Sequence, residues 1–304
     1  MSVAAIIGVL GLLGPLPERF QYSQVHMGVE VRVTLYAPDA ETAQRATRAA
    51  FERFAELDAI CSDYRKDSEL SLLCAQAGGE PIPVSNELYT LLERSEEVSK
   101  LSDGAFDITC GPLIRLWREA RKTKILPTTP ALQQARLDTG WYRVKLDPAT
   151  KTARLAPGTR LDLGGIAKGY ACDEAIAVLR RVGIDRAMVE AGGDIAASGP
   201  PPGKIGWRIE VMRRGGEAFW LRDGAASTSG DAEQFVVVGG KRYSHIVDPR
   251  TGIGLTNRRQ VTVLARDGLT TDALATALCI LGPTEGRPLL ERFKATAIFT
   301  EASR

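Results

Sequence analysis

The sequence predicts an α+β fold with mainly antiparallel sheets flanked by helices. Segments that favour β structure gather in the second half of the chain, at residues 186–189, 207–212, 235–238, 242–247 and 260–265. Short turns separate neighbouring segments, and strands joined by short turns pair antiparallel. A doubly wound parallel sheet, in which helices alternate regularly with strands, is therefore not expected.

The first half opens with one strand and three helices. Residues 29–35, VEVRVTL, alternate apolar and polar side chains as a half-buried strand does. Apolar residues at helical spacing predict a long helix over residues 43–57, and a short helix begins near Ser68. Residues 85–101 form another amphipathic helix, which starts at a capping serine and is stopped by Gly104.

The remaining elements alternate with loops. The prolines and threonines of residues 122–134 predict an exposed connection, and residues 143–155 predict a hairpin that turns near Asp147. Helical patterns at residues 166–181 and 272–281 interrupt the strands of the second half.

Composition excludes several classes of function. Lys+Arg number 39 and Asp+Glu 37, with no basic stripe, so nucleic acid is not an expected partner. The five cysteines form no CxxC pair, which excludes a zinc ribbon and a thioredoxin-type motif. The only histidines are His26 and His245, so a bound metal would take oxygen ligands, and magnesium is the expected ion.

The N-terminus carries a signal-like apolar segment. Residues 3–13 are apolar but too short to span a bilayer, and glycine and prolines follow them. Neither a preceding basic residue, nor an A-x-A site, nor a nearby lipid-attachment cysteine accompanies the segment. We divide the chain into this segment, residues 1–20, and one domain, residues 21–304. We expect export to the periplasm or the outer face of the inner membrane. A buried first strand or a misplaced start is the alternative for the segment, and the cytoplasm is the alternative location.

A glycine turn is the first candidate for chemistry. Residues 160–170 place an apolar strand, two glycines and a helix in succession, with Asp162 and Lys168 flanking the turn. The segment matches neither GxGxxG nor GxxxxGK[ST], although glycine lets a ligand approach the backbone closely. A tight strand-to-helix connection without a ligand explains it at least as well.

Two further segments carry polar residues suited to catalysis. Asp272 and Thr276 lie four residues apart, so a helix would place a carboxylate and a hydroxyl on one face, where they suit magnesium; helix capping by Thr270 and Thr271 with core packing is the alternative. His245 precedes a loop, where a neighbouring carboxylate would orient it for proton transfer, although a lone histidine is more often structural.

The hydroxyl-rich residues 227–231 have a shape that suits phosphate oxygens, and an ordinary turn explains them equally well when they are judged alone. Seven ordered segments together span about residues 27–281: 27–28, 104–113, 161–170, 191–194, 227–230, 245–252 and 271–276. Read in order, these segments resemble the ApbE family, the FAD:protein FMN transferases.

The resemblance implies a fold of two lobes with FAD in the cleft between them. It assigns FAD contacts to six positions: Met27, Ala105, Phe106, Asp107, Asp162 and Lys168. It assigns magnesium ligands to the Gly165 backbone carbonyl and the side chains of Asp272 and Thr276. One family variant has an aspartate where this chain has Ala275, so a second metal ion is not expected.

The implied reaction is Mg²⁺-dependent transfer of FMN from FAD to a threonine or serine hydroxyl, with release of AMP. His245 would act as the general base. The implied partner is an acceptor flavoprotein subunit, expected in a membrane redox complex. Hydrolysis of FAD to FMN and AMP is the nearest alternative, and a flavin- or metal-binding protein without turnover is another. A serine hydrolase is disfavoured because GxSxG is missing.

Overall fold

A seven-stranded antiparallel sheet forms the centre of the protein. The computed structural model describes residues 16–211, 218–230 and 234–301. The strand order is β1-β2-β6-β7-β10-β15-β16. Their bounds are β1 (Glu18–His26), β2 (Val29–Ala37), β6 (Ala187–Ala191), β7 (Asp194–Ala197), β10 (Gly224–Gly230), β15 (Arg259–Ala265) and β16 (Thr296–Glu301).

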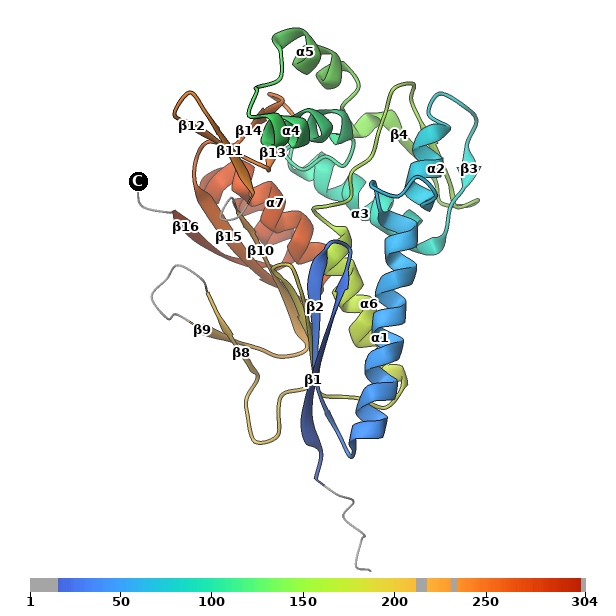
Figure 1. The fold of residues 1–304 in the computed structure, drawn as a ribbon, viewed down its shortest axis with the longest axis vertical. Helices are drawn as coiled ribbons and strands as arrows, with labels where there is room; N and C mark the ends of the chain where they lie inside the picture. The colour runs from blue at the N-terminus through green and yellow to red at the C-terminus, as the bar shows by residue number, and fades with distance from the viewer. Residues whose placement is uncertain (1–15, 212–217, 231–233, 302–304) are drawn as a thin grey trace, which may run out of the picture.

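Three helices cover one face of this sheet, and a two-stranded ribbon covers the other (Figure 1). The helices are α1 (Ala40–Cys61), α6 (Ala167–Arg181) and α7 (Gly268–Glu285); the ribbon is β8 (Trp207–Glu210) paired with β9 (Ala218–Leu221). Alternation along the strands decides the faces: Val33 and Val189 pack against α1 and α6. Tyr36 and Met188, an odd number of residues away on the same two strands, pack against the ribbon.

A second group of elements lies beyond one end of α1 and α6 (Figure 1). Its helices are α2 (Glu69–Ala75), α3 (Asn86–Leu101), α4 (Gly111–Thr123), α5 (Thr129–Leu137) and the 3₁₀ turn Trp141–Arg143. Its small sheet has the order β3-β5-β4, from Ile82–Pro83, Thr152–Leu155 and Val144–Asp147. The remaining elements are the hairpins β11 (Phe235–Val238) with β12 (Lys241–Ser244) and β13 (Val247–Asp248) with β14 (Ile253–Gly254), and α8 (Arg287–Phe293).

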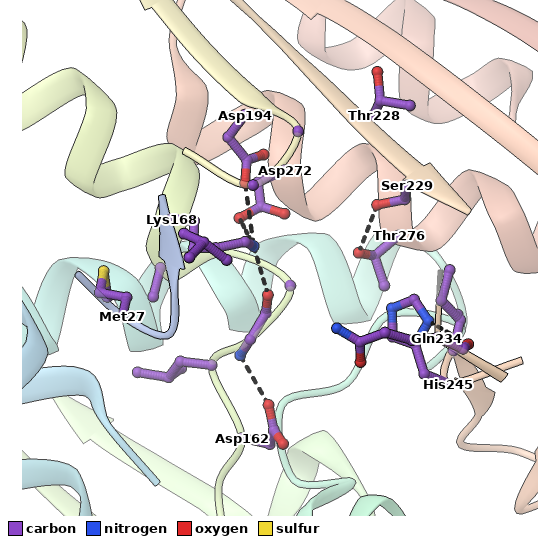
Figure 2. A pocket seen from close by; sticks show the side chains of 18 of the residues that line it. Met27, Asp162, Lys168, Asp194, Thr228, Ser229, Gln234, His245, Asp272 and Thr276 are labelled. Carbon is purple, nitrogen blue, oxygen red and sulfur yellow. Dashed lines mark hydrogen bonds and ion pairs between the residues drawn. The ribbon is translucent and has the colours of Figure 1, made fainter. Parts of the chain in front are cut away.

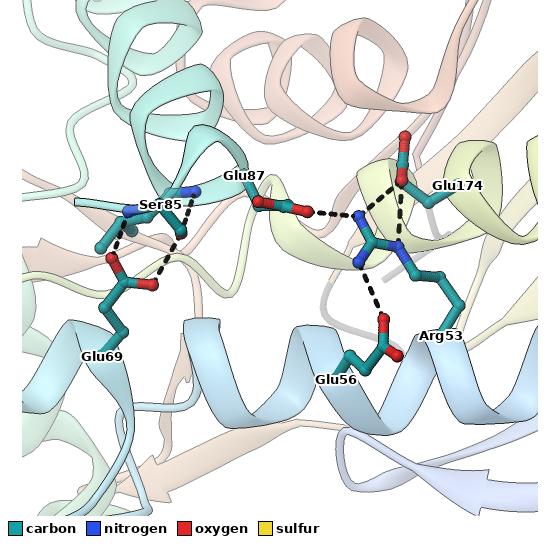
Figure 3. A network of polar contacts seen from close by, with 7 residues as sticks. Arg53, Glu56, Glu69, Ser85, Glu87 and Glu174 are labelled. Carbon is teal, nitrogen blue, oxygen red and sulfur yellow. Dashed lines mark hydrogen bonds and ion pairs between the residues drawn. The ribbon is translucent and has the colours of Figure 1, made fainter. Parts of the chain in front are cut away.

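Polar contacts hold the two groups together (Figure 3). Arg53 on α1 donates to Glu87 on α3 at 2.7 Å and to Glu174 on α6 at 2.7 and 3.0 Å. Within the second group, Glu69 on α2 accepts from both the backbone N–H and the hydroxyl of Ser85, each at 2.6 Å, and so ties α2 to the start of α3. One apolar cluster also runs from the small sheet and α3 to α7 and β15, so both groups share a core.

The helices predicted from periodicity are confirmed, with small changes at their ends. Ser85 caps α3 by accepting from the Leu88 N–H at 3.1 Å, and the hairpin predicted over residues 143–155 forms as β4 and β5. The strand predicted over residues 242–247 is interrupted, because β12 ends at Ser244 and β13 begins at Val247.

Two predicted loops are wrong. Residues 122–134 contain the end of α4 and most of α5, because Pro130 stands in the first turn of α5, where a helix tolerates proline. Residues 227–230 belong to strand β10 instead of a turn, since β7 and β15 pair with it on both sides.

The predicted signal-like segment lies mostly outside the described residues, and β1 begins at Glu18, inside its expected range. Strand β1 is an edge strand in which Phe20 and Tyr22 pack against the core, while most of its other residues are exposed. Across the described ranges 16–211, 218–230 and 234–301, no helix combines the length and apolar character needed to cross a membrane.

Candidate functional site

A cavity of about 1010 Å³ lies where the end of the large sheet meets the second group of elements. The β1–β2 turn, the end of α1, residues 105–110, the glycine turn, β7, β10 and α7 all contribute to its wall. Every residue predicted for the site from the sequence lines this cavity, and Figure 2 shows some of them. They are Met27, Ala105, Phe106, Asp107, Asp162, Gly165, Lys168, His245, Asp272 and Thr276.

Helix α7 delivers Asp272 and Thr276 to this cavity. Asp267 caps the helix by accepting from the Thr270 N–H at 2.8 Å, so the predicted capping by Thr270 or Thr271 is wrong. Asp173 on α6 accepts hydrogen bonds from the N–H groups of the first two helical residues, Gly268 and Leu269, at 2.8 and 2.9 Å. The start of α7 is therefore fixed by two carboxylates.

Gly165 adjoins the side chain of Thr276. A Cβ atom on Gly165 would lie 2.9 Å from the Thr276 hydroxyl oxygen and 3.5 Å from the Phe106 ring. Asp272, only 3 % exposed, accepts from the Gly169 N–H at 3.1 Å. A backbone turn, a hydroxyl and a buried carboxylate thus converge, and this set of hard oxygen donors fits Mg²⁺.

A lysine lies beside this donor set. Lys168 Nζ is 3.1 Å from an oxygen of Asp194 and 3.7 Å from one of Asp272, and it donates to the Gly164 carbonyl at 3.1 Å. Burial opposes the charged form of Lys168, but the two carboxylates outweigh it and raise the pKa of the ammonium. Burial and the nearby Asp194 raise the pKa of Asp272. The ammonium therefore partly neutralises two buried carboxylates.

Asp162 is held in the glycine turn. One of its oxygens accepts from the Gly164 N–H at 2.8 Å, and the other accepts from Arg118 at 2.7 Å. Arg118 also pairs with Asp63 and lies 4.4 Å from the centre of the Tyr64 ring. Burial, and secondarily Asp63, raises the pKa of Asp162. Arg118, Asp63 and Tyr64 line the same cavity.

The other residues predicted to contact FAD shape the wall of the cavity. Met27, at φ 49°, and Gly28, at φ 74°, form the two-residue turn between β1 and β2. Phe106 is almost fully buried, and its N–H donates to Ser102 at 3.1 Å. Asp107 accepts from the N–H and hydroxyl of Thr109 at 2.8 and 2.6 Å, and burial raises its pKa.

His245 follows strand β12 and lines the cavity as well. Its Nδ1 lies 3.1 Å from the backbone carbonyl oxygen of Gln234. The backbone N–H of His245 donates to the same oxygen at 3.0 Å. A proton on Nδ1 would bond this carbonyl and leave Nε2 able to accept a proton. The neighbouring carboxylate expected from the sequence stays a prediction.

Several residues of the site were missed by sequence reasoning. In the sequence, Asp194 belongs to the segment 191–194 and Ser229 to the hydroxyl-rich segment 227–231, and neither residue is predicted to have a role of its own. The signal that was available for Asp194 is its place directly after two glycines, Gly192 (φ 58°) and Gly193 (φ 100°), which turn β6 into β7. Arg118 and Tyr64 had no local signal, because only the tertiary fold brings them to Asp162.

Comparison with known proteins gives consistent results. The model of the ApbE family matches residues 27–299. The FAD:protein FMN transferase of Vibrio cholerae is 35% identical over 96% of this chain and 90% of that protein, and the one from Treponema pallidum is 33% identical over 96% and 87%. The flavin transferase ApbE structure from Vibrio cholerae superposes with a TM-score of 0.84 at 32% identity, covering 94% of both chains. The apo flavinyl transferase ApbE from Pseudomonas stutzeri gives 0.85 at 29% identity, covering 97% of this chain and 94% of that one.

Proposed function

The chain belongs to the ApbE family, and we propose that it transfers the FMN half of FAD, in a Mg²⁺-dependent reaction, to a threonine or serine hydroxyl of an acceptor protein. The observation that carries the metal part of this proposal is the convergence of Gly165, Asp272 and Thr276 in one cavity with His245. The FAD part rests on the same cavity and on the relatives' activity.

The carbonyl of Gly165 and the side chains of Asp272 and Thr276 would hold Mg²⁺. When bound there, the ion would neutralise diphosphate oxygens of FAD and make AMP a better leaving group. Lys168 adds a positive charge beside Asp272, which would favour binding of the same diphosphate. Burial of Asp194 and Asp272 keeps these charges out of bulk water, where they would be screened.

His245 takes the part of general base. The Gln234 carbonyl favours the tautomer with the proton on Nδ1, so Nε2 can remove the proton of the acceptor hydroxyl. The hydroxyl oxygen then bonds to the phosphorus nearer riboflavin, the bond from that phosphorus to the bridging oxygen breaks, and AMP leaves with that oxygen. The acceptor keeps FMN through a phosphoester.

The acceptor protein and the compartment belong to the same proposal. The apolar residues 3–13 favour export, and a membrane redox subunit on the outer side of the inner membrane is the expected acceptor. An intact N-terminus on cytosolic protein would contradict the export part alone.

Intact mass spectrometry of an acceptor domain tests the reaction. The purified protein is incubated with FAD, Mg²⁺ and a domain that carries a flavin-acceptor threonine. The wild type should add the mass of one FMN and release one AMP, and Asp272→Ala and His245→Ala should each abolish both. Release of AMP and free FMN without a gain in acceptor mass would instead indicate FAD hydrolysis.

A further inference from the structure

Strand β10 presents two serines to helix α7 and one threonine to the opposite face. Ser227 lies 2.7 Å from Thr271 and Ser229 lies 3.4 Å from Thr276, measured between hydroxyl oxygens. Thr228, between the two serines, faces away and pairs with Thr262 on β15 at 2.9 Å. Alternation along a strand explains why only the two serines reach α7.

The spacing of the strand matches that of the helix. Two residues along a strand advance about 6.8 Å, and the five residues from Thr271 to Thr276 advance about 7.5 Å along a helix. The rise therefore lets each serine lie level with one threonine, while the turn of about 140° between Thr271 and Thr276 places the two contacts on different sides of the helix. They differ in surroundings: the pair Ser227–Thr271 is buried, whereas Ser229 and Thr276 both line the cavity (Figure 2).

The backbone at Ser229 is also fixed. Ser229 pairs with Val261 in the central sheet, and the Cys279 thiol on α7 donates to the Ser229 carbonyl oxygen at 3.3 Å. The Ser229 backbone is therefore held both by strand β15 and by helix α7, next to the point where the Ser229 and Thr276 hydroxyls meet. This arrangement fixes the position of the Ser229 backbone beside Thr276.

A neutral hydroxyl that coordinates a metal ion uses an oxygen lone pair, and its proton needs an acceptor elsewhere. We propose that Ser229 is a positioning residue whose hydroxyl oxygen accepts a hydrogen bond from the Thr276 hydroxyl and so turns a lone pair of Thr276 toward Mg²⁺. This inference rests on the proposed metal site. The contact resembles the outer-shell hydrogen bonds that orient metal ligands in other proteins.

Titration of Mg²⁺ into the metal-free, full-length protein, followed by calorimetry, tests this role. Loss of an outer-shell partner weakens metal binding about 10–100-fold, so Ser229→Ala should raise the Kd for Mg²⁺ by about 10-fold. Ser229→Thr keeps the hydroxyl and should stay within about 3-fold of the wild type. In a Thr276→Val background, Ser229→Ala should change the Kd less than about 2-fold, because the ligand that it orients is gone.

Ser227→Ala is the matched control, since it removes a similar hydroxyl pair from the same strand and helix. It should lower the unfolding free energy while leaving the Kd for Mg²⁺ unchanged. An unchanged Kd in Ser229→Ala, with clear binding by the wild type, would contradict the proposal alone. A weakened affinity for FAD in EDTA, with the Kd for Mg²⁺ unchanged, would also overturn it, because Ser229 would then contact the substrate. No Mg²⁺ binding by the wild type would contradict the metal site itself.

Discussion

Two aspartates and one lysine set the charge of the site. Asp194 and Asp272 are each 3 % exposed, and the Lys168 ammonium lies within 3.7 Å of an oxygen of both. Two carboxylates in such a place repel each other unless a cation lies between them. Lys168 therefore supports the fold as well as the site.

Lys168→Met should destabilise the protein by about 3 kcal/mol, because it removes the partner of two buried carboxylates. Urea unfolding monitored by circular dichroism measures this change. The double variant Lys168→Met/Asp194→Asn should recover much of the loss, since one carboxylate is neutralised. Lys66 is exposed, so Lys66→Met should change the unfolding free energy by less than about 0.5 kcal/mol. Equal stability of Lys168→Met and the wild type would contradict this assignment.

The close crossing of helices α6 and α7 positions Asp272 in the site. Helices α6 and α7 approach each other through two glycines: a Cβ on Gly169 would lie 2.1 Å from the Gly268 carbonyl oxygen and 2.8 Å from Cβ of Asp272. Gly169 also donates its N–H to Asp272. The same close approach therefore holds the two helices together and places the carboxylate.

Gly169→Ala should separate α6 from α7 and move Asp272 away from the glycine turn. We expect a loss of about 2 kcal/mol in the free energy of unfolding, as is typical of overpacked interiors, together with weaker Mg²⁺ binding. Urea unfolding and calorimetry measure the two effects. Wild-type values for both would show that the helices do not need this contact.

Arg53 ties α1 to α3 and α6, and its contribution depends on pH. Its hydrogen bond to Glu87 lowers the pKa of that carboxyl below 4.5, although burial opposes the shift. A lowered pKa means that the folded state holds the carboxylate form more strongly than the unfolded chain does. The stability from Glu87 is therefore present above pH 4.5 and is lost as the pH falls below that value.

Arg53→Met should cost about 2 kcal/mol between pH 6 and 8, since it leaves Glu87 and Glu174 without their partner. The difference from the wild type should shrink as the pH falls below 4.5, when Glu87 takes up a proton. Arg48→Met on the same helix, at an exposed position, is the matched control and should have little effect. A difference that is independent of pH from 3 to 7 would contradict the role of Glu87.

At the scale of the whole molecule, the site lies where the large sheet and the second group of elements meet, and both contribute to its wall. Strong local patterns made much of this predictable: periodicity and caps gave α1, α3 and α6, and ordered short motifs gave the family. Strand β10, GAASTSG, has few β-favouring residues and forms because strands pair on both of its sides. Only this tertiary placement brings Ser229 to Thr276, so no local pattern could predict the contact.

The central claim is that Gly165, Asp272 and Thr276 hold the metal of an FMN transferase. Crystals soaked in Mn²⁺, which accepts the same oxygen ligands, would locate the ion by anomalous scattering. We predict one peak in contact with the Gly165 carbonyl, the Asp272 carboxylate and the Thr276 hydroxyl, with Lys168 still paired to Asp194. A peak between Asp194 and Asp272 with Lys168 displaced, or a peak outside the cavity, would contradict the account.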